Sequence, residues 1–460
     1  MSTLARKIVT RWAECETQPL PDGVAEAARM HLLDAIGVGL ASAGSAIGSP
    51  YQAYADRRVA FGPASVFGRN EGAGPADAAM LNGGLIHSLE YDDTHTASIV
   101  HGSAVLAATA LAAGEAYAAT GADVLRAYAL GWDVLIRFGQ AAPGSFQAVG
   151  FQITSVGGAL VAALIAARLM RLDNDKTVAA VGIALSQASG VFEFLSNGAT
   201  VKSLHPGWAA HAGIVAAGLA EAGLTGPETS LEGRFGLFRG FARDEAAPDR
   251  LDADIATLGD VWHLTDAAFK FYPCCHYLHP FIEAAGQLAE RGVMAASIEK
   301  LVCRVPEGAA GIICEPWAAK RAPASGHAAR WSLPIAVAAR LIDGKIDLDT
   351  FETPASAAVR ALAKRLEWEP LPGADFPRRF EAEIVCHLHN GDKQHVRVDD
   401  VYGNRSRPAD PAAVLAKFRA NAERSLPAAS VLALETAMSR LERAHDLTEL
   451  TAALRGRAEN

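Results

Sequence analysis

FEAEIVCHLHNGDKQHVRV, residues 380–398, is the clearest β-hairpin in the chain. Two arms rich in β-prone residues flank Asn390–Gly391, and this dipeptide is the strongest short-range signal for a turn between them. Upstream, IEKLVCRV at 298–305 predicts another strand, and the segment 331–341 predicts a helix that opens with Ser-Leu-Pro. The middle of the chain therefore predicts an α+β domain.

The segments on both sides of this domain have a helical pattern. Apolar residues recur at three- and four-residue spacing, alanine is abundant, and no alternating strand pattern occurs before residue 266. The helical pattern returns after Pro411 and continues to Leu454. The predicted fold is mainly α: an all-helical domain formed from both chain ends (1–265 and 401–460) plus a smaller inserted α+β domain (266–400). The clearest predicted helices are Val24–Leu40, Ala104–Ala119, Asp123–Phe138 and Ala209–Ala222.

The composition argues against several classes of protein. The chain has 460 residues, 50% hydrophobic, which is too apolar for disorder, and its net charge of -9 comes without the basic cluster of a nucleic-acid-binding protein. The longest apolar run, Val156–Ala167, is too short to span a bilayer, which takes about 20 helical residues. Residues 1–16 lack the apolar stretch of a signal peptide, and the six cysteines form no disulfide framework. We expect a cytoplasmic protein with no nucleic-acid or membrane partner.

Titratable residues gather in LNGGLIHSLEYDDTHTASIVHGS at 81–103. At helical spacing His87, Glu90, Tyr91 and Thr94 share one face, and the residues after Thr94 predict a loop. Three interpretations stay open here. The segment has the residue types of a metal site without a fixed ligand spacing, it could be a solvated helix end with capping carboxylates, or it could be a metal-free acid/base site. The cluster comprises His87, Glu90, Asp92, Asp93, His95 and His101.

Two later segments favour the acid/base interpretation. In KSLHPG at 202–207, Lys202 has small or apolar neighbours, which suits a lysine that faces an anionic ligand. In KFYPCCHYLHP at 270–280, His276 or His279 is a candidate acid/base group. The cysteines of that segment lack the paired spacing of a zinc site, and the other cysteines are too scattered for an iron–sulfur cluster. Because no phosphate-binding glycine loop occurs either, we expect no metal and no organic cofactor.

Taken together, these segments resemble the MmgE/PrpD family over nearly the whole chain. The family includes 2-methylcitrate dehydratase, cis-aconitate decarboxylase and an iminodisuccinate epimerase. The resemblance implies a helical domain formed by both chain ends with an inserted α+β domain, a small di- or tricarboxylate substrate, and a homodimer. It is carried by LLDAIGVGL (32–40), the 81–103 segment, GFQITSVGGALVAALIAARLMRLD (150–173), KSLHPGWAAHAGIVAAGLAEAGLTGPETSLEG (202–233), KFYPCCHYLHP (270–280) and YGNRSRP…KF (402–418).

The resemblance also implies roles for individual residues. Two positions depart from the decarboxylase branch: Glu90 stands where that branch has Asp, and Gln152 stands where it has a histidine that can titrate. Gly102 also replaces a common Pro. The residues implied as catalytic are His101, His279, Lys202, Glu90 and Thr94. We assign to substrate binding Lys202, Gln152, Asp93, His87 and Tyr272.

The branches of the family differ in how they handle a proton beside a carboxylate carbon. Because Gln152 removes one proton carrier, we favour a 2-methylcitrate-type dehydratase, which abstracts that proton and expels a β-hydroxyl. An iminodisuccinate-type epimerase, a cis-aconitate-type decarboxylase and a non-enzymatic carboxylate-binding protein remain alternatives. His101 and Lys202 fall in the predicted helical domain and His279 just past its boundary, so we expect the site where the two domains meet.

Overall fold

The computed structural model describes residues 2–196 and 198–456, and helices carry most of them. The chain divides into two structural units. Unit 1 holds the residues up to Ser88, Asp92–Ala267 and the residues from Pro411 on, whereas unit 2 holds Leu89–Tyr91 and Ala268–Asp410. The fold is mainly α with a smaller α+β portion, as the sequence predicts. Within the described residues, every helix is too short or too polar to cross a bilayer.

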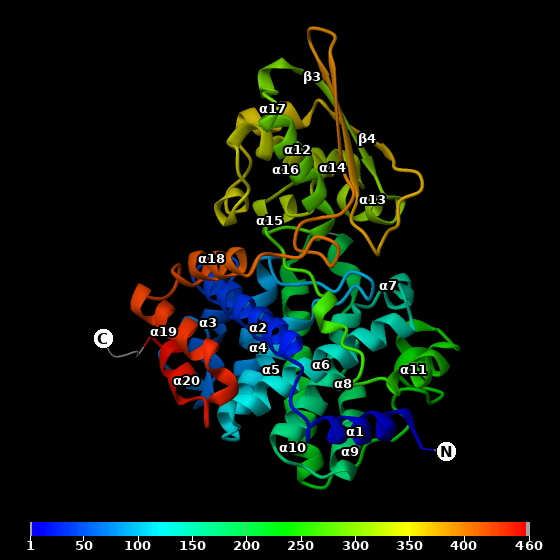
Figure 1. Ribbon diagram of the computed structural model, residues 1–460, viewed down its shortest axis with the longest axis vertical. Coiled ribbons are helices and arrows are strands. Elements are labelled where there is room, and N and C mark those ends of the chain that lie inside the picture. The colour runs from blue at the N-terminus through cyan, green and yellow to red at the C-terminus, as the bar shows by residue number, and fades with distance from the viewer. Residues whose placement is uncertain (1, 197, 457–460) are drawn as a thin grey trace. The chain divides into compact units, whose positions relative to one another are not determined.

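Unit 1 is a bundle of helices in which both ends of the chain take part (Figure 1). All four clearest predicted helices are confirmed, with bounds that differ by a few residues at their ends. The helices of unit 1 are α1 (Leu4–Cys15), α2 (Asp22–Ala43), α3 (Ser49–Arg58), α4 (Pro75–Ser88), α5 (Gly102–Ala116), α6 (Gly121–Ala141), α7 (Ser145–Val149), α8 (Ile153–Leu169), α9 (Asn174–Leu185), α10 (Leu204–Glu221), α11 (Ala247–Ile255), α18 (Pro411–Ala422), α19 (Ala428–Ser439) and α20 (Thr448–Leu454). Short 3-10 or π turns are η1 (Phe192–Ser196), η2 (Thr200–Ser203), η3 (Phe238–Ala242), η4 (Leu264–Asp266) and η8 (Leu441–Arg443).

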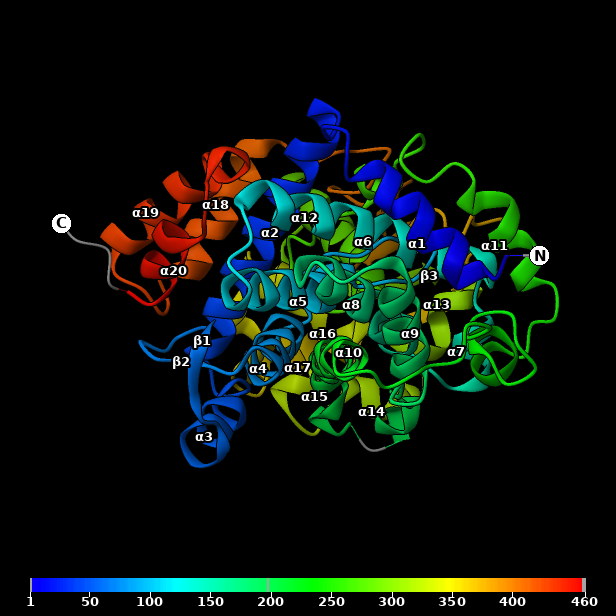
Figure 2. The same ribbon diagram turned by 90° about the horizontal axis from the view of Figure 1, so that it is seen from below.

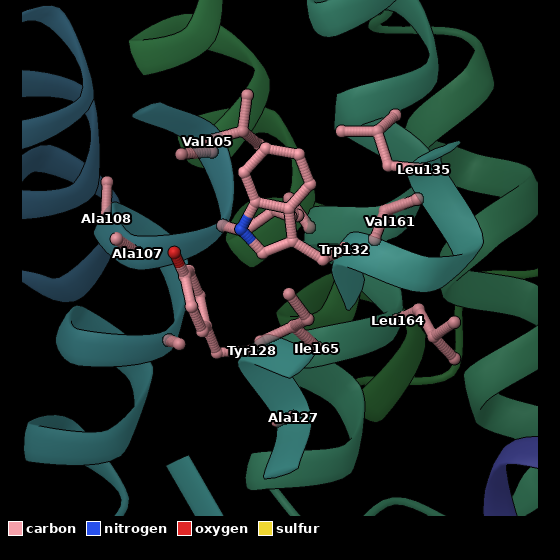
Figure 3. Close-up of a cluster of buried hydrophobic side chains, with 14 of the residues drawn as sticks. Val105, Ala107, Ala108, Ala127, Tyr128, Trp132, Leu135, Val161, Leu164 and Ile165 are labelled. Carbon is pink, nitrogen blue, oxygen red and sulfur yellow. The ribbon is translucent and has the colours of Figure 1, made fainter. Parts of the chain in front are cut away.

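Helix α8 lies inside this bundle and is apolar on all sides, which is the pattern of a buried helix. Small residues let its neighbours come close: a Cβ at Gly213 of α10 would lie 2.4 Å from the Cβ of Ala162. Figure 3 shows the larger side chains that fill the space between α5, α6 and α8, among them Tyr128 and Trp132. The core that holds the site is therefore built from alanine-rich helices around a few large aromatic anchors.

The C-terminal helices complete the same bundle. Helix α18 packs against α2, and Figure 1 and Figure 2 both show the red and orange C-terminal helices beside blue α2. Lys417 of α18 lies 2.8 Å from a carboxylate oxygen of Asp34 of α2, and both side chains are buried. Burial raises the pKa of Asp34, and the charge of Lys417 opposes that rise. The ion pair thus ties the two chain ends together inside unit 1.

Unit 2 is built on a four-stranded sheet with strand order β4-β3-β5-β6. Strand β3 (Ile298–Val305) pairs parallel with β4 (Leu366–Pro370) and antiparallel with β5 (Ala382–Leu388), and β5 pairs antiparallel with β6 (Lys393–Val398). The predicted hairpin is confirmed, with Gly391 at φ +90° in its turn. Helix α12 packs against β5 and β6. The helices of unit 2 are α12 (His279–Glu290), α13 (Glu307–Ile313), α14 (Trp317–Arg321), α15 (Gly326–Ala329), α16 (Leu333–Asp343) and α17 (Ala357–Ala363), with 3-10 turns η5 (His276–Leu278), η6 (Ala295–Ser297) and η7 (Leu348–Phe351).

The prediction that no strand occurs before residue 266 is wrong. Strands β1 (Phe61–Ser65) and β2 (Gly72–Ala73) form a small antiparallel pair. The sequence FGPAS has no apolar alternation, so the strand signal is missing. Its end is held instead from outside, because the Glu115 carboxylate accepts hydrogen bonds from the backbone and the hydroxyl of Ser65, both at 2.6 Å.

Candidate active site

In the histidine- and carboxylate-rich segment 81–103, the helix ends earlier than the residue spacing predicts. Helix α4 ends at Ser88, and Glu90 has a φ of +53°. A left-handed residue cannot continue a right-handed helix, so the predicted shared helical face of His87, Glu90, Tyr91 and Thr94 is wrong. Of these residues, His87 and Thr94 belong to unit 1, whereas Glu90 and Tyr91 belong to unit 2.

Two neighbouring aspartates each hold a histidine from a different helix. Asp92 Oδ2 accepts a hydrogen bond from Nδ1 of His87, at the end of α4, over 2.8 Å. Asp93 Oδ2 accepts one from Nδ1 of His31 in α2, also over 2.8 Å. All four side chains are buried. A carboxylate on Nδ1 fixes the orientation and the tautomer of an imidazole, so both rings are held rigidly.

Asp93 is surrounded by further donors from the protein. Its carboxylate accepts from the Ser103 hydroxyl at 2.5 Å and from the Ser103 backbone nitrogen at 3.3 Å. The Ser103 hydroxyl is also hydrogen-bonded to Tyr128, and burial raises the pKa of that phenol well above its usual value. Asp93 is predicted to bind substrate, and the structure places its carboxylate in a buried polar network with His31 and Ser103. This network holds the loop that follows α4 in position.

Thr94 and His101 lie together at the start of α5. Nδ1 of His101 is 2.9 Å from the Thr94 hydroxyl and 3.1 Å from the backbone oxygen of Asp93. Because a carbonyl oxygen only accepts, Nδ1 carries a proton, and in the neutral ring the lone pair therefore lies on Nε2. His101 is half-buried, and its backbone nitrogen donates to the Thr154 hydroxyl at 3.0 Å. This is the arrangement of an imidazole that takes or gives a proton through Nε2.

Gln152 connects this region to α10. Its amide nitrogen lies 3.4 Å from Nε2 of His87, and its amide oxygen accepts from Nδ1 of His205 at 2.7 Å. The rings of His87 and His101 lie 5.1 Å apart between centroids. Burial, with smaller effects from His87 and Lys202, lowers the pKa of His205 to about 4. His205 is thus part of the candidate site.

Lys202 supplies positive charge beside His205. It lies in η2 and is buried, with only 9% of its surface exposed. The next residue, Ser203, is hydrogen-bonded to the hydroxyl of Tyr51 at 2.8 Å, which holds η2 against α3. A nearly buried lysine in a protein of net negative charge is suited to bind an anionic group of a ligand.

In unit 2, two buried cations hold the segment that contains Glu90. Lys270 donates to the backbone oxygen of Glu90 at 3.3 Å, and Arg330 donates to the backbone oxygens of Leu89 at 2.7 Å and Pro273 at 2.5 Å. Burial lowers the pKa of Arg330 to about 10. Arg330 has no signal in the local sequence, because its partners lie 57 and 241 residues away along the chain.

His279 opens α12 in a cluster of aromatic rings of unit 2. Its ring centroid lies 4.6 Å from that of His276 and 5.1 Å from that of Tyr272. Burial raises the pKa of Tyr272 to about 12. His276 in turn contacts Phe380 edge to face at 4.9 Å. Among the described residues of the chain, no group of three or more His, Cys, Asp or Glu side chains is arranged to hold a metal ion.

The predicted site residues of unit 1 thus form one connected group. In unit 1, hydrogen bonds and ring contacts link Thr94, His101, His87 and Gln152, and Lys202 adds its charge beside His205. Sequence reasoning missed His31, which contacts the segment from 62 residues away and carries no local signal. The predicted residues in unit 2 are Glu90, Tyr272 and His279.

Comparisons with known proteins cover nearly the whole chain. The family model of the MmgE/PrpD N-terminal domain matches residues 6–249, and that of the MmgE/PrpD C-terminal domain matches residues 272–443. The chain is similar to the cis-aconitate decarboxylase of Mus musculus, with 31% identity over 95% of this chain and 90% of the mouse protein. The human cis-aconitate decarboxylase is 32% identical over 83% of this chain and 80% of its own length. That of Aspergillus terreus is 30% identical over 62% of this chain and 60% of its own length.

Proposed function

The chain belongs to the MmgE/PrpD family, and we propose that it is a lyase that acts on a small di- or tricarboxylate. The relatives named above are lyases of a tricarboxylate. The observation that carries the proposal is the connected cluster of unit 1, where His101, the bridged pair His87 and His205, and Lys202 gather within one helical bundle. It combines a proton-transfer group with a fixed cation, as a reaction beside a carboxylate requires.

Each residue of the cluster has a proposed task. Lys202 binds a substrate carboxylate, because a lysine ammonium is a compact positive charge. His101 transfers the proton, with Thr94 and the Asp93 carbonyl fixing its Nδ1. The family resemblance also assigns catalytic roles to Glu90 and His279 of unit 2.

Two lyase reactions fit these residues. In a dehydration of the 2-methylcitrate type, a base removes the proton beside a carboxylate and the β-hydroxyl leaves as water after protonation. In a decarboxylation, the bond to one carboxylate breaks, CO₂ leaves, and an acid protonates the carbon that keeps the electron pair. Gln152, which cannot titrate, favours the first reaction, and the names of the relatives favour the second.

NMR of candidate acids in deuterated water distinguishes these reactions. The panel contains 2-methylcitrate, citrate and cis-aconitate, each with wild-type protein and with Lys202→Met. New alkene signals from the hydroxy acids indicate dehydration, and loss of CO₂ with deuterium uptake indicates decarboxylation. Exchange without net conversion indicates an epimerase. If ligands shift thermal stability and none of the acids reacts, the lyase proposal fails and a carboxylate-binding protein remains.

Two further parts of the proposal concern cofactors and assembly. We propose that turnover needs no metal, because the sequence shows no ligand spacing typical of a metal site. Activity should survive dialysis against EDTA, and recovery with one divalent ion after a loss would contradict this. From the family resemblance we also propose a homodimer. Sedimentation at several concentrations should show twice the 48.2 kDa mass of the chain rather than a single-chain species.

A further inference from the structure

The hydrogen bonds around Gln152 form a continuous chain through the bundle of unit 1. Asp92 Oδ2 lies 2.8 Å from Nδ1 of His87, and the amide nitrogen of Gln152 lies 3.4 Å from Nε2 of the same ring. The amide oxygen of Gln152 then lies 2.7 Å from Nδ1 of His205. These side chains are almost fully buried: 1% of His87, 4% of Gln152 and 7% of His205 are exposed. Bulk water therefore has little access to replace any of them as a hydrogen-bond donor or acceptor.

The backbone around Gln152 leaves its amide available for this bridge. Gln152 is the N-cap residue of α8, but its side chain makes no capping hydrogen bond. Its backbone nitrogen donates instead to the oxygen of Gly190 at 3.0 Å. Gly190 also borders the His205 ring, because a Cβ at 190 would lie 3.4 Å from Cγ of His205. The same loop thus positions both the amide and the imidazole that it meets.

The direction of the amide fixes where the protons are. An ionised carboxylate only accepts, so Asp92 requires a proton on Nδ1 of His87. The amide nitrogen of Gln152 only donates, so Nε2 of His87 holds a lone pair. The amide oxygen only accepts, so Nδ1 of His205 carries a proton. One arrangement satisfies all three contacts, and it leaves His87 a neutral imidazole.

The charges around the two rings support the same state. Lys202 lies near His205, and a second positive charge there would be repelled. Burial is the largest cause that lowers the pKa of His205, to about 4, which leaves this ring uncharged at neutral pH. His87 faces Asp92, Gln152, the ring of His101 at 5.1 Å between centroids and, beyond the amide, His205.

We propose that Gln152 is a positioning residue that holds His87 and His205 as neutral imidazoles with the proton on Nδ1. The consequence for turnover rests on the proposed lyase function. If His87 and His205 stay neutral, His101 is the histidine of this cluster that is left to exchange protons in the working pH range. Lys202 is then the positive charge that binds a substrate carboxylate, because neither His87 nor His205 carries a positive charge that could bind the carboxylate in its place.

Gln152→Glu tests the inference with almost no change in shape. A carboxylate at 152 can accept from Nδ1 of His205 but cannot donate to Nε2 of His87. His87 should therefore take up a second proton and become an imidazolium between two carboxylates. Gln187→Glu is the matched control, because Gln187 lies in the same unit, is half-buried, and donates only to the backbone oxygen of Ala212 at 3.4 Å.

The measurement is ¹⁵N NMR of labelled histidines, which reports the protonation of each ring nitrogen without any substrate. In the wild type at pH 7, His87 and His205 should both show a protonated Nδ1 and an unprotonated Nε2. Gln152→Glu should protonate Nε2 of His87, add a second titration to the pH profile of kcat, and lower kcat by about 10²-fold. Gln187→Glu should keep the wild-type spectra and profile.

The results separate this inference from the proposed function. It is overturned if His87 of the wild type carries protons on both nitrogens at pH 7, as a reversed amide would require, or if Gln152→Glu leaves both rings unchanged. The wild-type spectrum decides this even if the variant does not fold. If the spectra match the expectation and no acid of the panel reacts, the tautomer assignment stands and only the lyase proposal fails.

Discussion

Replacing Gly207 with alanine should push apart the two helices that carry His87 and His205. Gly207 lies where α10 crosses α4, and a Cβ at this position would lie 2.2 Å from the backbone oxygen of Met80. An ordinary contact between carbon and oxygen is about 3.3 Å. Because the opposing atom belongs to a buried backbone and not to a flexible side chain, α10 has to move by about 1 Å.

The expected cost follows from this overlap. Overpacking a buried contact costs about 1–3 kcal/mol, and alanine returns about 0.5–1 kcal/mol of helix propensity relative to glycine. An overlap of about 1 Å against backbone corresponds to the upper part of the first range, so the free energy of unfolding should fall by about 2 kcal/mol. His205 moves with α10, whereas Gln152 caps α8, so the same shift should lengthen their 2.7 Å contact and lower kcat by about 10²-fold.

Urea unfolding followed by circular dichroism measures the first effect, and initial rates measure the second. Gly218→Ala is the matched control, because it lies in the same helix and a Cβ there would meet no atom within 4 Å. This control should gain about 0.5–1 kcal/mol and keep full activity. If Gly207→Ala and Gly218→Ala unfold at the same urea concentration, the close crossing does not set the spacing of the site.

The remaining predictions test individual groups. His101→Ala should fold normally by circular dichroism and lose about 10²–10⁴-fold in turnover, and near-full turnover would reject it as the proton-transfer group. Lys202→Met should raise KM more than it lowers kcat, whereas the reverse would place the lysine in the chemical step. The pKa of His205 falls from 6.5 to about 4 on folding, so the free energy of unfolding of the wild type should decrease as the pH drops through this range. His205→Asn lacks this titration, so its free energy of unfolding in urea should decrease by up to about 3 kcal/mol less than that of the wild type over the same range. Parallel curves for the two proteins would contradict this. Lys417→Met leaves Asp34 buried without its lysine and should lower the free energy of unfolding in urea by about 3–5 kcal/mol. Adding Asp34→Leu to the same chain should restore much of this loss. No loss in the single variant would show that Asp34 is protonated in the folded state.

The sequence predicts best those elements whose signal is local. Strand β3 has the predicted bounds, and the turn at Asn390–Gly391 is confirmed because these two residues alone favour it. The pair β1–β2 has no such signal, since its support comes from Glu115, 50 residues away. Propensity and spacing are short-range, so contacts of this kind leave no trace in them.

The candidate site shows the same division. Thr94 and His101, seven residues apart, are joined by a hydrogen bond as their proximity in the sequence suggests. Glu90 was misplaced on a helical face, because a single left-handed residue redirects the chain and has no signal in the periodic pattern. The link between His87 and Gln152 spans 65 residues and depends on how the helices pack, which one sequence does not show.

The ion pair between Asp34 and Lys417 has a consequence for synthesis on the ribosome. These residues are 383 positions apart, so at about 5–20 residues per second α2 waits about 20 to 80 seconds for the helix that covers it. During that interval the face of α2 that α18 covers, with the carboxylate of Asp34, has no final partner, although α4, α5 and α6 can already pack on its other faces. Unit 2, which lies almost entirely between them in the sequence, can complete its sheet while the first segments of unit 1 are still waiting. Nascent chains stalled before residue 411 should therefore bind chaperones through α2 and release them once α18 emerges.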